Sequence, residues 1–367
     1  MIVDEKAPPP EPDRLGDAPH PRTTPRVLGH GAAEAEFLAA FNDGRLHHAW
    51  MMSGPRGVGK ATLAWRLARF LLATPHHDDG LFAAPPPDSL DIAPDNPVAR
   101  RMAALAEPRL FLLRRPWNEK TEKLASQITI DETRKLKGFF QLSAADGGRR
   151  AVIIDAADEM NTAAANAILK VLEEPPAHTT LFLVTHQPAR LLPTIRSRCR
   201  MLRLSGLDPD DLIAALDQAG VTSTAPEVLH GLAQGSVGDA IALEHAGGPA
   251  LYGQMVGLLA TLPEMDRRAA QELAQDAASP ERFELILTLF DRMLARLSLT
   301  GARNRPPAEI VPGEAETLMR LSPDLAAGRR WAARAEGLTA RARRGRAVNL
   351  DPSLLILDMC LALARSP

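Results

Sequence analysis

Cysteine is nearly absent from this sequence, since only Cys199 and Cys360 occur among its 367 residues. The two cysteines lie far apart in the chain and match no spacing that metal ligands use. A disulfide framework is therefore not expected, and a reducing cytoplasm is the simplest location for the protein.

Long apolar runs are also missing, and the charges nearly balance. No run is long enough to cross a bilayer, so we expect no membrane partner. The formal net charge of −2 makes the whole molecule no obvious binder of polyanions. A local basic face could still contact nucleic acid. The length and the 45% hydrophobic content predict a soluble globular protein of two or three domains.

The N-terminal stretch "MIVDEKAPPPEPDRLGDAPHPRTTPR" is acidic and rich in proline. It contains no apolar segment, so it is not expected to be a secretory signal. Its composition predicts a disordered tail over residues 1–26.

Residues 27–205 alternate short apolar runs with helical patterns, which predicts an α/β domain with a parallel sheet. Several runs lack polar alternation, as strands buried on both faces do. The clearest helices are expected at 60–73 and 161–174, and prolines at 175 and 176 end the second. The expected strands cover residues 49–53, 109–114, 127–130, 150–155 and 180–185.

The pattern becomes helical after residue 205. It predicts a small helical unit over 206–247 and an all-helical domain over 248–367. In the second, apolar residues recur at spacings of three and four, which indicates one stripe that packs a core. A leftover apolar face of such helices could also pack on other subunits. The residues of the stripe are Phe283, Leu287, Phe290, Leu294 and Leu297.

The motif "GPRGVGK" at residues 54–60 follows an expected strand and opens an expected helix, which is the context of a phosphate-binding loop. Glycines at 54, 57 and 59 would let backbone amides point inward, and the helix N-terminus would add its positive end. The alternative is a glycine-rich turn without a ligand, but the full spacing favours phosphate binding. The candidate phosphate-binding residues are Gly54, Gly57, Gly59 and Lys60.

The residue after the lysine departs from a working loop. A hydroxyl at this position is a direct Mg²⁺ ligand, and Ala61 cannot supply one. Thr62 lies about 100° further round the helix, so its side chain should face elsewhere. We nevertheless keep Thr62 among the candidate nucleotide-contacting residues. Mg²⁺ binding is expected to be weak or absent.

A second part of the site is expected at the end of the strand in "AVIIDAADEM" (151–160). Asp155 stands where a carboxylate would hold the metal through water. An active ATPase of this kind has Glu next to it as the group that polarises water, and here that residue is Ala156. Asp158 and Glu159 lie beyond the strand end and are more plausible as caps of the next helix.

Two further stretches, "NAILKVLEEPP" (166–176) and "TIRSRCRMLRL" (194–204), occur in this order. Together they strongly resemble the clamp-loader branch of AAA+ proteins. The resemblance runs from residue 29 through Leu204 with few gaps, and more loosely across the helical remainder. It implies a AAA+ domain over residues 27–205, a helical lid over 206–247 and a helical collar, which mediates oligomerisation, over 248–367.

The resemblance also implies roles for single residues. Arg198 matches the arginine finger that enters the ATP site of a neighbouring subunit, where a planar permanent cation can neutralise charge on the transferred phosphoryl. Without the motif, Arg198 would be interpreted as part of a solvated basic turn. Thr185 matches the position that senses the γ-phosphate, although an ordinary strand-end hydroxyl explains it equally well. Gly238 stands where active relatives carry a sensing arginine.

The sequence contains two further groups of candidate site residues, one for zinc and one for DNA. Active relatives carry a zinc module with cysteine ligands, but no cysteine precedes Cys199. Neighbouring His and Asp residues at 76–79 rarely coordinate together without distant partners, so no zinc and no other structural metal is expected. A basic group on a probable helix could meet DNA phosphates, although charged helix faces are usually only solvated. The residues considered for a metal are His76, His77, Asp78 and Asp79. The residues considered for DNA are Arg134, Lys135 and Lys137.

The leading interpretation is a non-motor clamp-loader subunit that supplies Arg198 to a neighbour and hydrolyses little ATP itself. Its partners would be three motor subunits and a clamp-opening subunit in a pentamer, and through them the sliding clamp and primer-template DNA. Binding of ATP or ADP stays open. The alternatives are an active motor ATPase of the same family and an unrelated P-loop enzyme such as a nucleotide kinase.

Overall fold

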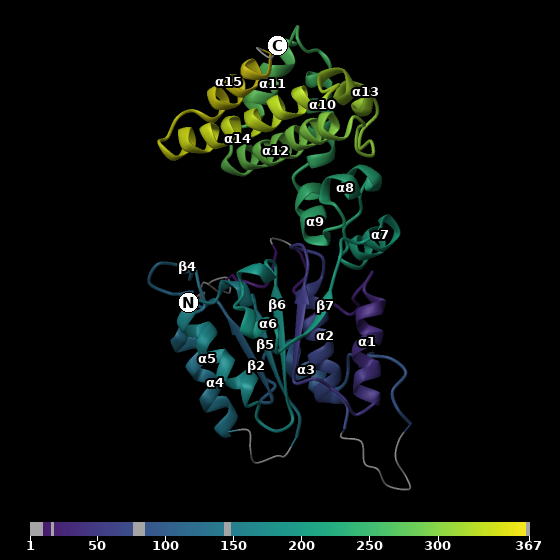
Figure 1. Cartoon of the computed structure of the whole chain (residues 1–367), viewed down its shortest axis with the longest axis vertical. Coiled ribbons are helices and arrows are strands. Elements are labelled where there is room, and N and C mark those ends of the chain that lie inside the picture. The colour runs from purple at the N-terminus through teal and green to yellow at the C-terminus, as the bar shows by residue number, and fades with distance from the viewer. Residues whose placement is uncertain (1–9, 16–17, 76–84, 143–147, 365–367) are drawn as a thin grey trace, which may run out of the picture. The chain divides into compact units, whose positions relative to one another are not determined.

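The computed structural model describes residues 10–15, 18–75, 85–142 and 148–364 (Figure 1). The contacts divide the chain into two compact units. The first holds residues 1–220 with 235–238, and the second holds 221–234 with 239–367. We describe each unit by itself.

The first unit is built on a five-stranded parallel sheet in the order β2-β5-β6-β1-β7. All residues of β1 and β6 are buried, which explains why their sequences show no polar alternation. The predicted α/β class is confirmed, and four of the five expected strands are present. The strands are β1 Ala49–Ser53, β2 Leu110–Arg114, β5 Arg150–Asp155, β6 Thr179–Thr185 and β7 Arg200–Arg203.

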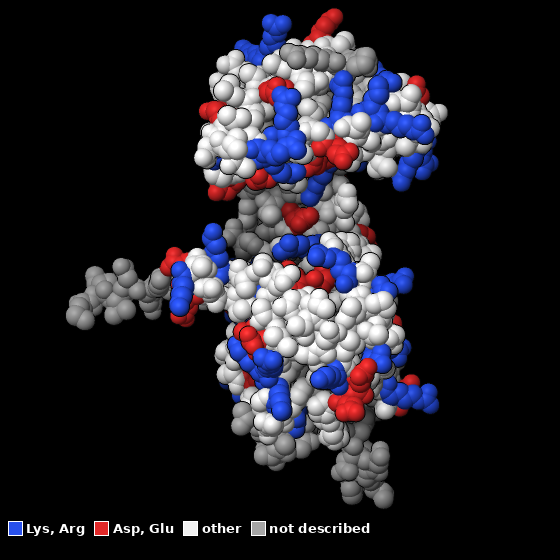
Figure 2. Space-filling model, turned by 60° about the vertical axis from the view of Figure 1, so that its left-hand side comes forward, with Lys and Arg blue, Asp and Glu red and all other residues white. Residues whose placement is uncertain are grey.

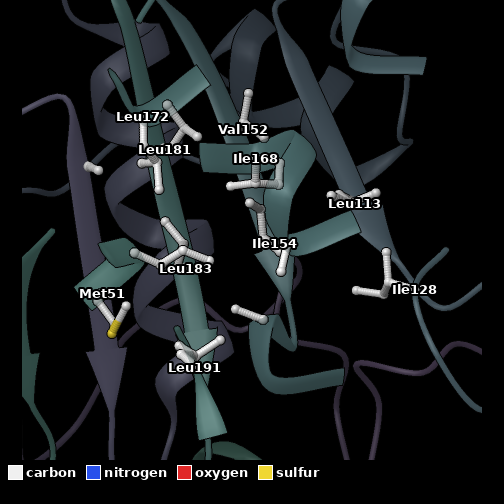
Figure 3. Packing of buried hydrophobic residues seen from close by; sticks show 14 of the residues in the cluster. Met51, Leu113, Ile128, Val152, Ile154, Ile168, Leu172, Leu181, Leu183 and Leu191 are labelled. Carbon is white, nitrogen blue, oxygen red and sulfur yellow. The ribbon is translucent and has the colours of Figure 1, made fainter. Parts of the chain in front are cut away.

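Helices cover both faces of this sheet. On one face, Leu181 and Leu183 of β6 pack in a cluster with Ile168 of α5 (Figure 3). On the other face, Phe182 of the same strand packs against Phe37 of α1, with ring centroids 5.9 Å apart. The helices of this unit are α1 Gly31–Asn42, α2 Lys60–Ala73, α3 Pro97–Ala103, α4 Ile130–Leu142, α5 Thr162–Glu173, α6 Pro193–Arg196 and α7 Pro209–Gln218.

The prediction of a strand over residues 127–130 is wrong. Ile128 makes only an isolated bridge to Met160, and Ile130 already begins α4. Two acidic residues, Asp131 and Glu132, stand in the first turn of that helix, where the helix dipole favours negative charge. A small antiparallel pair, β3 Trp117–Asn118 and β4 Lys123–Leu124, precedes this segment.

The described residues near the N-terminus pack on the first unit, which differs from the disorder expected over residues 1–26. His20 is 7% exposed and meets the edge of Trp65 in α2, with ring centroids 6.1 Å apart. Nη2 of Arg69 donates to the carbonyl of Arg22 at 2.6 Å. The composition of this segment resembles that of a disordered tail, but its few charged and aromatic contacts are specific.

The second unit is helical, as predicted, and the apolar stripe of α12 forms its core. All five stripe residues are at most 1% exposed. Ser279 caps α12 by accepting from the amide of Arg282 at 3.1 Å. The helices from residue 226 onward are α8 Pro226–Ala233, α9 Val237–His245, α10 Gly248–Ala260, α11 Arg267–Asp276, α12 Pro280–Arg303, α13 Glu314–Leu321, α14 Leu325–Ala347 and α15 Pro352–Ala364.

Candidate nucleotide-binding site

The loop at residues 54–60 joins β1 to α2, as the motif predicts (Figure 1). Gly57 and Gly59 have φ values of 76° and 100°, a region that side-chain-bearing residues rarely adopt. Gly59 is also the residue immediately before α2, so the amides of the loop lead directly into the helix N-terminus. This local geometry is that of a phosphate cradle.

Lys60 is 3% exposed at the start of α2. Its ammonium donates to the carbonyl of Gly54 at 2.9 Å and to the carbonyl of Pro55. Burial lowers the pKa of Lys60 to about 8, although the carboxylates of Asp155 and Asp158 oppose that shift. An anionic ligand close to such a buried ammonium would stabilise its charged form.

Asp155 and Thr185 come together because they end adjacent strands. In the register of the sheet, Thr185 lies opposite Ser53, the last residue of β1, and Asp155 lies opposite Val184. Their side-chain oxygens Oδ2 and Oγ1 are buried and have no hydrogen-bond partner among the described residues. Such atoms fit a polar ligand at this edge of the sheet.

His186 is a residue of this site that the sequence analysis missed. Its Nδ1 is buried without a partner among the described residues. Burial lowers the pKa of His186 to about 4, and the charge of Lys60 adds to the effect. The neutral imidazole is therefore the form present at physiological pH. In the sequence, only the position of His186 directly after Thr185 indicates that it belongs to this site.

The carboxylates that follow Asp155 are engaged elsewhere. Asp158 accepts from the amides of His186 at 3.1 Å and Gln187 at 3.2 Å. Glu159 pairs with Nε of Arg115 at 2.6 Å. Each therefore has a structural partner, and Ala156 and Ala157 separate both from the strand end. Ala61 and Thr62 occupy the first turn of α2, both partly exposed.

Replacing Asp155 with Asn is expected to stabilise the protein, increasingly as the pH rises. Burial, and then the charge of Asp13, raises the pKa of Asp155 from 3.8 to about 7. The stability that the protonated carboxyl contributes to the folded protein is fully present below about pH 4 and is lost as the pH rises to about 7. The gap in unfolding free energy should grow by at most about 1.4 kcal/mol per pH unit in that window. Urea unfolding at several pH values measures the gap.

An exposed carboxylate provides the matched control for this experiment. Asp131 pairs with Arg134 at the surface in the first turn of α4, so Asp131→Asn should change the unfolding free energy by at most about 1 kcal/mol and should not stabilise the protein as the pH rises. Parallel stability profiles for the parent and Asp155→Asn would contradict the expectation.

Arg198 follows α6, and its side chain is 37% exposed. Its Nη1 donates to the carbonyl of Thr194 at 3.1 Å, and its Nη2 lies 3.0 Å from Oε1 of Glu173. Glu173 belongs to the "LEEPP" stretch, so the structure joins the two motifs that carried the resemblance. The nearby Arg200 pairs with Glu36 at 2.7 Å.

Two of the three basic residues considered for DNA contact pair with acids on their own helix. Arg134 lies 3.1 Å from Asp131, and Lys135 lies 2.7 Å from Glu132. Lys137 is exposed. On the face shown in Figure 2, blue and red side chains intermix on the first unit. This pattern favours a solvated helix face over a dedicated DNA surface.

One group of possible metal ligands occurs in the described part of the chain, formed by Glu11, Asp13 and His20. Arg22 and Arg114 already pair with its carboxylates, at 2.5–2.7 Å. Positive charge is thus supplied by the protein itself, which argues against a cation there. The histidines and aspartates at 76–79 lie outside the described residues. No helix among the described residues has the length and apolar content to cross a membrane.

A glycine-rich loop between β1 and α2, beside acidic and hydroxyl strand ends of a five-stranded parallel sheet, gives the first unit a P-loop α/β fold of the AAA+ type, and a large helical region follows in the chain. Residues 29–208 match the family described as "DNA polymerase III, delta subunit". This part of the chain is similar to that family, and the predicted resemblance to clamp-loader proteins is confirmed by relatives named DNA polymerase III subunit delta′.

Several individual proteins are similar to parts of this chain. The chain is 38% identical over 152 residues to DNA polymerase III subunit delta′ of Pseudomonas aeruginosa, which covers 41% of each protein. It is 31% identical over 210 residues to subunit delta′ of Escherichia coli, covering 57% of this chain and 58% of the relative. The matches therefore span about half of these relatives. A solved gamma subunit-related protein from Thermotoga maritima aligns with 90% of this chain and 100% of its own, at 17% identity and a TM-score of 0.41.

Proposed function

We propose that this chain is a non-motor subunit of the DNA polymerase III clamp loader, which helps to load the sliding clamp onto primed DNA. The observation that carries the proposal is the placement of Arg198. Its guanidinium is partly exposed and is held by Glu173 and the carbonyl of Thr194. A positioned surface arginine outside the chain's own phosphate loop suits action in a neighbour's ATP site.

The chain's own site supports phosphate binding better than hydrolysis. Backbone amides of Gly54, Gly57 and Gly59 would cradle the phosphates of ATP or ADP, with Lys60 supplying positive charge. Bound nucleotide would supply a phosphoryl group for transfer. Ala61 offers no metal-ligand hydroxyl, so Mg²⁺ would bind weakly, and we propose no zinc.

The missing base supports the same conclusion. Asp158 and Glu159 are both engaged with structural partners, and Ala156 has no polar side chain. A positioned general base contributes about 10²–10⁴-fold to a rate. The site would therefore hydrolyse ATP very slowly.

The proposed partners are three motor subunits and one clamp-opening subunit of a cytoplasmic pentamer, with the clamp and primer-template DNA contacted through the complex. Within the chain, the AAA+ domain would span residues 27–205, the lid 206–247 and the collar 248–367. The large apolar core of the helical region supports a collar that is stable enough to carry intersubunit contacts.

A second candidate, an active motor subunit of the same complex, is favoured by one observation. Lys60, Asp155 and Thr185 are all buried at one edge of the sheet, and the last two have unpartnered oxygens. Thr185 could sense a γ-phosphate there. The absence of a hydroxyl at Ala61 and of a base at Ala156 weighs against this candidate.

ATP turnover by the isolated chain separates the two candidates. We expect the rate with Mg²⁺ to equal that of Lys60→Ala, because neither the metal ligand nor the base is present. Arg198→Ala is the control, and it should not change this rate since the finger acts on another subunit. Mg²⁺-dependent turnover that Lys60→Ala abolishes would show instead that the chain is a motor.

A further inference from the structure

The N-terminal residues 10–15 and 18–26, here called the strap, are fastened to the first unit at several points. Nε of Arg22 donates to the carbonyl of Ala103 at 3.1 Å. Nη1 of Arg66 in α2 donates to the carbonyl of Pro25 at 3.3 Å. With the contacts of His20 and Arg69 described above, these bonds fix residues 18–26 along α2 and α3.

The earlier part of the strap reaches the nucleotide site through a charged cluster. Oδ1 of Asp13 lies 2.5 Å from Nη1 of Arg114, and Oε2 of Glu11 lies 2.7 Å from the same nitrogen. Arg114 is the residue of β2 that stands opposite Asp155 in the sheet. The side chain of Asp13 is fully buried, and its charge helps to raise the pKa of Asp155.

Leu15 then lies against Gly238, which in turn contacts the phosphate loop at Gly57. A Cβ atom built on Gly238 would lie 2.4 Å from Cδ1 of Leu15 and 3.3 Å from Cα of Gly57. The amide of Gly238 also donates to the carbonyl of Gly57 at 3.2 Å. Leu15, Gly238 and Gly57 are therefore packed in succession, and a larger residue at 238 would collide with Leu15.

We propose that the strap is a built-in cover of the phosphate loop, and that Glu11–Leu15 must move away before this chain can bind a nucleotide. The proposal rests on the phosphate-binding role of the loop proposed above. The cover also explains why residue 238 is glycine, because Leu15 fills the space into which an arginine side chain would project.

The cover can be tested by nucleotide binding to truncated chains. A chain lacking residues 1–15 loses the cover and keeps the anchors at His20 and Arg22, whereas a chain lacking only residues 1–9 keeps both. Fluorescent ADP should bind about tenfold or more tightly to the first than to the second or to the full chain, because the fraction of open loop limits apparent affinity. Lys60→Ala in the shorter chain should remove that binding.

A milder variant keeps the test decisive if the shorter chain does not fold. Leu15→Ala in the full chain removes only the side chain that packs on Gly238, and thermal unfolding checks that it is folded. Tighter ADP binding by Leu15→Ala supports the cover. Equal binding by the full chain and the folded variants, or no binding by any of them, overturns it. Neither result bears on Arg198, whose role is measured in the assembled complex.

Discussion

Replacing Arg198 with Ala is expected to slow ATP hydrolysis at the neighbouring motor site by about a thousandfold, while the complex still assembles. The physical reason is charge. The transferred phosphoryl gains negative charge on its oxygens in the transition state, and a permanent guanidinium close to it stabilises that charge. The measurement is single-turnover hydrolysis by the reconstituted complex, since total turnover falls less if the other sites keep their own fingers.

Three variants sharpen this prediction. Arg198→Lys keeps the charge but loses the planar fork, so it should recover only part of the rate. Glu173→Gln removes the ion pair at Nη2 of Arg198, and should reduce hydrolysis less than Arg198→Ala does. Arg200→Ala is the matched control, because Arg200 pairs with Glu36 and lies over Trp50. Unaltered hydrolysis with Arg198→Ala would refute the finger assignment.

Replacing Glu314 with Ala is expected to destabilise the helical unit by about 3–5 kcal/mol. Glu314 is 1% exposed at the start of α13. Its carboxylate accepts from Tyr252 Oη at 2.6 Å, from Nε of Arg296 at 2.6 Å and from the amide of Ile310 at 2.7 Å. Removing it leaves the phenol of Tyr252 without its acceptor and the largely buried guanidinium of Arg296 without its carboxylate partner. Urea unfolding measures the loss.

Two controls separate charge from shape in this network. Glu314→Gln keeps one acceptor oxygen and similar volume, so it should cost less than Glu314→Ala. Arg268→Ala breaks an exposed pair with Glu272, and should change the unfolding free energy by less than about 1 kcal/mol. If Glu314→Ala were no more costly than Arg268→Ala, the network would not stabilise the unit.

Local sequence determined most of the elements. Residues 49–53 and 150–155 are strands over the predicted ranges, because apolar runs without polar alternation fit strands buried on both faces. The helix expected over 161–174 spans Thr162–Glu173, because Asn161 caps its start and prolines follow its end. The loop at 54–60 was recognisable for the same reason, since its glycine spacing is a local requirement.

Only the tertiary structure decided how these elements meet. The sheet register brings Asp155, Thr185 and Lys60 to one edge, although they are distant in sequence. The pair between Glu173 and Arg198 joins two motifs that were read separately. Leu15 lies against Gly238 although the composition of its segment predicts disorder. Composition and periodicity report on neighbours along the chain, whereas these contacts depend on which distant surfaces the folded sheet presents to one another.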